Sequence, residues 1–101
     1  MRPGQQEARN LLGVILRHYR VKAGLTEKEA AERSGVSAST ISEIERGVCS
    51  PLATTVFHLC QALSIEPDVL LDGSIWNIEE QRWDVDPAKL SAYSASGREG
   101  R

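Results

Sequence analysis

The chain has 101 residues, a formal net charge of −2, and 41% hydrophobic against 26% charged residues. This size suits one domain, and this composition can bury a core without marking the chain as disordered. The longest apolar run, residues 11–16, is far shorter than the ~20 residues that a membrane-spanning helix needs. The polar amino terminus carries no secretory signal. We therefore expect a cytoplasmic protein that does not contact a membrane.

The side chains that carry catalysis or bind metals do not form recognisable groups. Cys49 and Cys60 lie outside any CxxC pattern and have no paired histidines, so we predict no metal site. His18 and His58 stand alone on predicted helices, as surface or boundary residues. The sequence contains no nucleophile–base pattern and no phosphate-binding glycine loop. We expect no enzymatic activity and no cofactor.

Glycine and proline divide the first 73 residues into short segments with helical periodicity. Apolar residues recur at helical spacing between Leu12 and Tyr19. They predict a first helix from Glu7 to Ala23, ended by Gly24 in the left-handed conformation.

The second and third predicted helices are short and close together. Thr26 and Glu29 form a T-x-x-E capping box, which marks the start of a helix that Gly35 stops. Ser37 then caps a third helix over residues 38–46. Two short helices joined by the turn Gly35-Val36-Ser37 are typical of a helix-turn-helix, whose second helix can enter the major groove of DNA.

Two further helices complete the predicted domain. Ser50-Pro51 provides an N-cap followed by proline at the first helical position. The inward stripe of this fourth helix is Val56, Leu59, Cys60 and Leu63. Pro67 opens a short fifth helix that holds Val69, Leu70 and Leu71.

Residues 12–71 resemble the Cro/C1-type (XRE-like) helix-turn-helix family of phage repressors and bacterial regulators. The resemblance implies an all-α, compact five-helix, lambda-repressor-like DNA-binding domain with a C-terminal extension. We assign residues 1–6 to a flexible amino terminus, 7–73 to the domain, 74–93 to the extension and 94–101 to a disordered tail. The resemblance rests on Leu12-Gly13, Arg20, Gly24-Leu25-Thr26, Ala31, Gly35-Val36-Ser37, residues 41–47 (ISEIERG), Ser50-Pro51, Thr55 and residues 62–65 (ALSI).

The resemblance also implies which residues face DNA. The alternative for this face is a plain solvated helix surface. Arg20 and Glu45 match the two residues that form a buried salt bridge in the family. The alternative is two independent surface charges. The expected DNA-binding residues are Thr26, Glu27, Lys28, Ser37, Ala38, Ser39, Thr40, Ser42, Glu43 and Arg46.

The chain departs from the family where relatives hold phosphates. Glu27 stands where many relatives carry glutamine, and Val48-Cys49 where they often carry basic residues. Residues 1–71 contain eight basic and eight acidic side chains, so no bulk positive charge favours DNA. We assign phosphate contacts first to Arg46 and Lys28, ahead of Arg17 and Arg33, and expect modest affinity per subunit.

A homodimer that binds a near-palindromic duplex follows from the resemblance, with its contact around Ile65, Pro67 and Val69. Trp76 and Trp83 lie outside the recognised domain. Either they fold over their own core, or they contact the second subunit or another protein. Asp86-Pro87 is a further helix start, for a helix reaching Tyr93.

The first hypothesis for function is a sequence-specific transcriptional regulator, most simply a repressor. Two alternatives stay open. One is an antitoxin-type regulator whose tail binds a toxin protein. The other is an adaptor that has kept the fold and binds protein instead of DNA.

Overall fold

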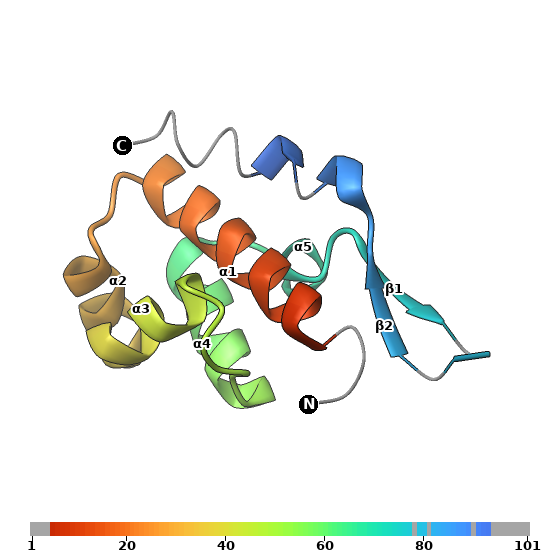
Figure 1. The fold of residues 1–101 in the computed structure, drawn as a ribbon. Helices are drawn as coiled ribbons and strands as arrows, with labels where there is room; N and C mark the ends of the chain where they lie inside the picture. The colour runs from red at the N-terminus through yellow and green to blue at the C-terminus, as the bar shows by residue number, and fades with distance from the viewer. Residues whose placement is uncertain (1–4, 78, 81, 90, 94–101) are drawn as a thin grey trace.

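The computed structural model describes residues 5–77, 79–80, 82–89 and 91–93. The predicted tail at 94–101 and the first four residues of the predicted flexible amino terminus lie outside this range. The helices are α1 (Gln5–Lys22), α2 (Glu27–Ser34), α3 (Ala38–Glu45), α4 (Ala53–Leu63) and α5 (Pro67–Leu70). The expected all-α, five-helix class with a C-terminal extension is confirmed. Helix α1 crosses the molecule, with α2 and α3 near one end and the extension starting at the other (Figure 1).

Most of the helix boundaries follow the predicted signals. The backbone φ is 75° at Gly24 and 77° at Gly35, so both predicted breaks use the left-handed conformation, as does Gly47 after α3 with φ 73°. Pro67 lies at the start of α5 as predicted. Helix α1 begins at Gln5, two residues before the predicted start. Leu71, predicted within the fifth helix, is instead its C-cap: its N–H donates to the carbonyl oxygen of Asp68 (3.2 Å), and its side chain is exposed.

The predicted start of the fourth helix at Ser50-Pro51 is wrong. Helix α4 begins at Ala53, with Leu52 in the extended N-cap conformation and no side-chain cap. The Ser50 hydroxyl instead accepts a hydrogen bond from Arg9 Nε at 2.8 Å. A serine caps a helix only when its oxygen is directed at the first-turn N–H groups, so this tertiary contact replaces the local signal.

The hydrophobic core lies between α1 and the other four helices. Its fully buried large side chains come from α1, α3, α4 and α5: Leu11, Ile15, Leu16, Ile41, Ile44, Leu59 and Leu70. Gly13 is buried where α1 crosses the end of α3. A Cβ atom there would lie 2.7 Å from the carbonyl oxygen of Glu45 and still closer to that of Ile44. The absence of a side chain at residue 13 therefore sets how closely α1 approaches α3.

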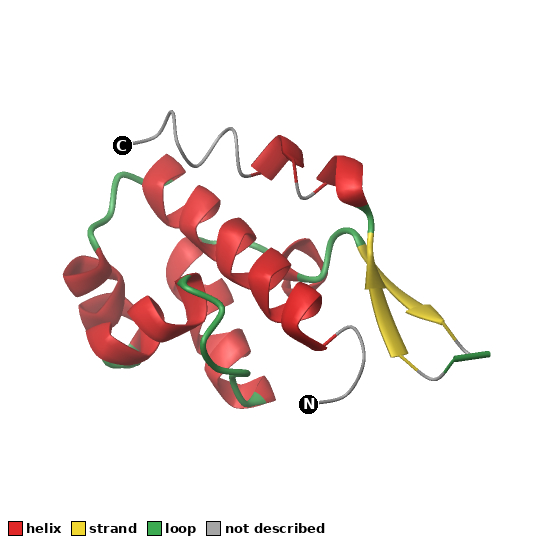
Figure 2. Cartoon of the chain, viewed as in Figure 1, coloured by secondary structure: helices red, strands yellow, loops and turns green. Residues whose placement is uncertain are grey.

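The extension begins with a hairpin that the sequence analysis did not predict. Strands β1 (Ser74–Asn77) and β2 (Arg82–Val85) pair antiparallel, with Trp76 opposite Trp83 (Figure 2). An isolated two-stranded hairpin is at best marginally stable in water. Here β2 packs against α1, and Val85 lies against the core. Tertiary packing therefore supports strands that local sequence signals alone do not mark.

A short helical segment returns from the hairpin along α1, as expected from Asp86-Pro87. Asp86 Oδ1 accepts a hydrogen bond from the N–H of Ala88 at 2.9 Å, and residues 87–89 and 91–93 are helical. Tyr93 donates to Asp72 Oδ2 at 2.8 Å, and Lys89 Nζ lies 3.3 Å from the same oxygen. The Tyr93 ring also packs against His18, with centroids 5.3 Å apart. These contacts return the extension to the helical domain.

Among the described residues, no helix is both long and apolar enough to cross a bilayer.

Candidate nucleic-acid interface

Helices α2 and α3 form the predicted helix-turn-helix. Gly35 has φ 77° and ψ 4°, and its N–H donates to the carbonyl oxygen of Ala31 at 2.9 Å. The next N–H, of Val36, donates to Ser34 Oγ at 3.1 Å, and the Val36 side chain packs on the core. The first two N–H groups of the turn are thus hydrogen-bonded, and one apolar side chain anchors it to the core, which sets the relative orientation of the two helices.

Ser37 caps α3 with a fully engaged hydroxyl group. Its Oγ accepts from the N–H of Thr40 at 3.1 Å, donates to Thr40 Oγ1 at 2.8 Å and lies 3.3 Å from Ser39 Oγ. Ser37 was predicted both to cap the helix and to bind DNA. The geometry directs it to the cap, so Ser37 starts the helix and brings the following residues to the surface.

One side of α3 is buried in the core, and its first turn is exposed to solvent. Ile41 and Ile44 are buried, with exposed fractions of 0% and 1%. The expected DNA-facing residues divide into two groups by exposure. Ser37, Ala38, Ser39 and Arg46 are exposed, whereas Thr40, Ser42 and Glu43 are half-buried. The most accessible side chains are therefore at the amino-terminal end of α3 and directly after its carboxyl end.

The amino-terminal end of α2 holds three more expected residues. Thr26 forms the predicted capping box: its N–H donates to Glu29 Oε1 at 2.9 Å, and Glu29 N–H donates to Thr26 Oγ1 at 3.0 Å. Hydrogen bonds from the backbone and the side chain of Thr26 to the carboxylate of Glu29 lower the pKa of Glu29. Lys28 is exposed and Glu27 is half-buried. Lys28 is thus a basic side chain accessible at a helix end whose N–H groups also favour anions.

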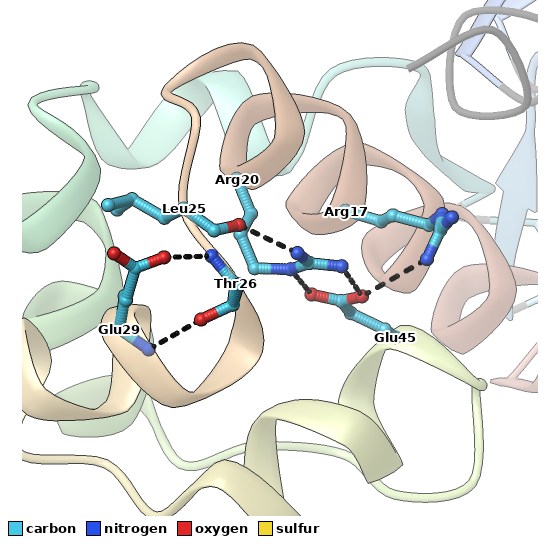
Figure 3. A network of polar contacts seen from close by, with 6 residues as sticks. All are labelled: Arg17, Arg20, Leu25, Thr26, Glu29 and Glu45. Atoms are coloured by element: carbon cyan, nitrogen blue, oxygen red, sulfur yellow. Dashed lines mark hydrogen bonds and ion pairs between the residues drawn. The ribbon is translucent and has the colours of Figure 1, made fainter. Parts of the chain in front are cut away.

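Arg20 and Glu45 form a bidentate ion pair beneath this surface (Figure 3). Arg20 Nε lies 2.6 Å from Glu45 Oε2 and Nη2 lies 2.9 Å from Oε1, while Nη1 donates to the carbonyl oxygen of Leu25 at 2.8 Å. The two side chains are 9% and 4% exposed. Two charges can be held at such burial only when they are paired and hydrogen-bonded, and this pair ties the end of α1 to the end of α3.

Neighbouring charges complete the network. Arg17 Nη1 lies 4.0 Å from Glu45 Oε1, so the structure places this candidate phosphate ligand beside a carboxylate. The hydrogen bond to Glu45 raises the pKa of Arg20 in spite of burial, and the carboxylate of Glu27 adds to the rise. Burial raises the pKa of Glu45, and the guanidinium groups of Arg20 and Arg17 oppose that rise. The charge of Glu27 therefore raises the pKa of both members of the ion pair.

A second set of contacts holds the loop that follows α3, and the sequence analysis missed it. Gln6 Nε2 donates to the carbonyl oxygen of Gly47 at 2.9 Å and to Asn10 Oδ1 at 2.8 Å. Arg9 Nε donates to Ser50 Oγ at 2.8 Å. These α1 residues are about 40 positions from the loop in the sequence. The one available signal was the spacing of Gln6, Arg9 and Asn10, since residues three and four apart are neighbours on a helix.

The expected dimer residues lie outside α2 and α3, the two helices of the helix-turn-helix. Ile65, Pro67 and Val69 are half-buried around the start of α5, and Ile65 packs against the core. Trp76 and Trp83 lie opposite each other in the hairpin.

The helix-turn-helix domain family matches residues 11–72, more than half of the chain. The chain belongs to this family. The HTH-type transcriptional regulator y4dJ of Sinorhizobium fredii is 37% identical over 59 residues, which cover 58% of this chain and 77% of that protein. ImmR of Bacillus subtilis, also an HTH-type transcriptional regulator, is 37% identical over 60 residues, 59% of this chain and 47% of ImmR. The matched segment thus spans about half of some relatives.

Solved structures agree with the family. The restriction-modification controller protein C.AhdI from Aeromonas hydrophila superposes with a TM-score of 0.60 at 32% identity, over 61% of this chain and 94% of that one. The clp gene regulator ClgR from Corynebacterium glutamicum gives a TM-score of 0.62 at 27% identity, over 87% of this chain and 77% of that one. The protein is a DNA-binding transcriptional regulator, not an enzyme.

Proposed function

We propose that the protein is a homodimeric, sequence-specific regulator, most simply a repressor, that inserts α3 into the major groove of a near-palindromic operator. The observation that carries this proposal is the division of α3 into two sides. Ile41 and Ile44 anchor the helix in the core, while Ala38 and Ser39 are exposed in its first turn. In a helix-turn-helix, the amino-terminal residues of the second helix are the ones that meet base edges.

The chemistry of this face suits a limited set of base contacts. The hydroxyl groups of Ser39 and Ser42 can donate to or accept from base edges, and the Ala38 methyl group can contact the methyl group of thymine. Glu43 can accept from the amino group of cytosine. Ser37 is assigned to the cap because its hydroxyl is hydrogen-bonded within the first turn of α3, twice to Thr40 and once, at 3.3 Å, to Ser39 Oγ. Base discrimination is thus assigned mainly to Ser39 and Ser42.

Exposed cations flank this face. We assign phosphate contacts to Lys28 at the start of α2 and to Arg46 at the end of α3, both exposed. We assign Thr26 and Thr40 to contacts with the DNA backbone beside these cations. The negative charge of Glu27 repels phosphate, so we expect a single subunit to bind DNA with modest affinity. Because Arg17 lies beside Glu45, it ranks below Arg46 and Lys28 as a phosphate ligand.

Dimerisation would supply the remaining affinity. We assign the contact to the half-buried residues Ile65, Pro67 and Val69, with Trp76 and Trp83 of the hairpin as a further contact to the second subunit or to another protein. A two-fold dimer presents two α3 helices to half-sites about one helical turn, ~34 Å, apart. Binding at such a site would block promoter access in the cytoplasm.

The test is selection of bound duplexes from a random pool at ~100 mM salt, since affinity for DNA depends steeply on salt. The wild-type protein is compared with a Ser39→Ala, Ser42→Ala double variant. A Thr54→Ala, Gln61→Ala double variant, which changes two exposed residues of α4, serves as the matched control. We expect the wild type and the control to enrich one near-palindrome and the α3 variant to lose that preference.

Two outcomes would contradict the proposal. Equal enrichment by all three proteins would show that α3 does not read the bases. No enrichment by any of them, together with a protein that co-purifies, would favour the adaptor hypothesis.

A further inference from the structure

We propose that Arg9 and Ser50 form a phosphate-binding site of the DNA interface, at the loop that follows α3. This inference rests on the proposed function. It assigns a contact from the amino-terminal half of α1, a helix that lies outside the helix-turn-helix itself.

The position of the loop follows from the dimensions of α3. Its eight residues extend about 12 Å at 1.5 Å per residue, and the major groove is about 12 Å wide. A helix of this length that brings its amino-terminal residues to base edges has its carboxyl end about one groove width away, toward a sugar–phosphate wall. The segment from Arg46 to Ser50 directly follows α3, so we place it near that wall.

Arg9 reaches this segment from α1. Its Nε donates to Ser50 Oγ at 2.8 Å, and this contact is exposed to solvent. A guanidinium group has five N–H donors, and this hydrogen bond uses one, so the N–H groups of the two terminal nitrogens lie outside it. A guanidinium group beside a serine hydroxyl is a pair of donors suited to a phosphodiester oxygen.

The site is held in place before any ligand binds. Gly47 has φ 73°, and its carbonyl oxygen accepts from Gln6 Nε2 at 2.9 Å. The N–H of Val48 donates to the carbonyl oxygen of Glu43 at 2.9 Å, and Cys49 packs against the core. A loop fixed at both of its ends loses little conformational entropy when it contacts DNA.

The site also supplies positive charge to a loop whose own sequence provides little. The loop residues Val48 and Cys49 carry no charge, although phosphate binding requires positive charge nearby. The fold supplies a cation there from a distant part of the chain. Arg46 is exposed at the start of the loop, and Arg9 contacts its last residue. The loop is thus flanked by two guanidinium groups.

The experiment measures the dissociation constant for the selected duplex across a salt series from about 50 to 200 mM. Each phosphate contact contributes about 0.9 to the slope of log affinity against log salt. We expect Arg9→Gln to reduce the slope by about this amount, so that its affinity deficit shrinks about threefold over the series. Base preference in the selection should stay unchanged.

Two variants separate a phosphate contact from a purely structural role. Arg9→Lys keeps the charge but lacks the Nε donor to Ser50, and we expect a slope close to that of the wild type. Lys22→Gln is the matched control for charge. This exposed lysine is 13 residues further along α1, about 20 Å away, and its loss should leave the slope unchanged.

The outcomes distinguish this site from the proposed function. If the wild-type protein selects no duplex, the proposed function fails first. If the wild type binds and Arg9→Gln keeps the wild-type slope, the phosphate site is wrong while the function stands. If Arg9→Lys behaves like Arg9→Gln, Arg9 acts by holding the loop, and the proposal is overturned.

Discussion

The helix-turn-helix and the C-terminal extension pack against the same helix, α1, but they are held there differently. The helix-turn-helix carries its own local signals, the Thr26–Glu29 capping box and the Ser37 cap, and is joined to α1 by a buried ion pair. The extension depends on contacts between distant residues, which converge on Asp72 from Tyr93 and Lys89. The contacts at Asp72 are also more exposed than the ion pair: the side chains of Lys89 and Asp72 are 48% and 35% exposed.

The two regions differ in how closely stability and function are coupled. The buried ion pair and the close contact at Gly13 set the position of α3. A substitution at either should therefore affect the whole domain and its reading face, the exposed side of α3 that is proposed to contact bases. The contacts of the extension lie near the surface, where a single hydrogen bond or ion pair contributes little. Its loosening should therefore be a local event.

The largest expected effect is that of Glu45→Gln. This change leaves the Arg20 guanidinium buried without its partner charge, at a cost of ~3–5 kcal/mol in the free energy of unfolding. Urea denaturation followed by circular dichroism measures the loss. Glu32→Gln, at an exposed position of α2, should change stability by less than ~0.5 kcal/mol. A similar small change for Glu45→Gln would show that the pair does not hold the domain together.

Gly13→Ala should come next, with a loss of ~1–3 kcal/mol from forcing a methyl group into a packed contact. In an exposed helix the same replacement stabilises by about 1 kcal/mol, so the sign of the change is informative. The new Cβ would meet the carbonyl oxygens of Ile44 and Glu45. A stabilised protein in thermal denaturation would show that α1 and α3 are not in close contact.

Thr26→Ala should cost ~1 kcal/mol, because it removes the side chain that accepts the hydrogen bond from Glu29 N–H. The same urea titration measures this, with Thr54→Ala in α4 as the control, since Thr54 is exposed and does not cap its helix. If both threonine variants lose equal stability, the capping box contributes nothing special to the helix-turn-helix.

Tyr93→Phe should have the smallest effect, about 0.5–1 kcal/mol on the opening of the extension. The reporter is hydrogen exchange at the Asp86 amide, which donates to the carbonyl oxygen of Gly73 at 2.8 Å. We expect faster exchange there and unchanged exchange in α3. Equal acceleration in both regions would mean that the extension and the helix-turn-helix open together.

The same contact predicts a pH dependence. Hydrogen bonds from Tyr93 and Lys89 lower the pKa of Asp72 below its ordinary value. A carboxyl group with a lowered folded-state pKa stabilises above its ordinary pKa of about 3.9, and that stabilisation is lost as pH falls through the lower folded value. Protection of the Asp86 amide should therefore be constant at neutral pH and fall at acid pH. Asp72→Asn should remove this pH dependence.

Much of the reading face could be predicted from the sequence because its determinants are local. The capping box, the left-handed glycine and the Ser37 cap each act within four residues, and they set where α2 and α3 begin and end. The resemblance to the family, carried by the spacing of these signals, added the expected DNA-facing positions. These positions stay predictions until DNA binding by their variants is measured.

Five helices, their order and the helix-turn-helix could be predicted from the sequence, because caps, breaks and periodicity are properties of short segments. The hairpin, the start of α4 at Ala53 and the contact of Arg9 with Ser50 could not, because they depend on residues far apart in the chain. In each case a partner brought close by folding supports or replaces the local preference, and short-range patterns do not record which distant residue that partner will be.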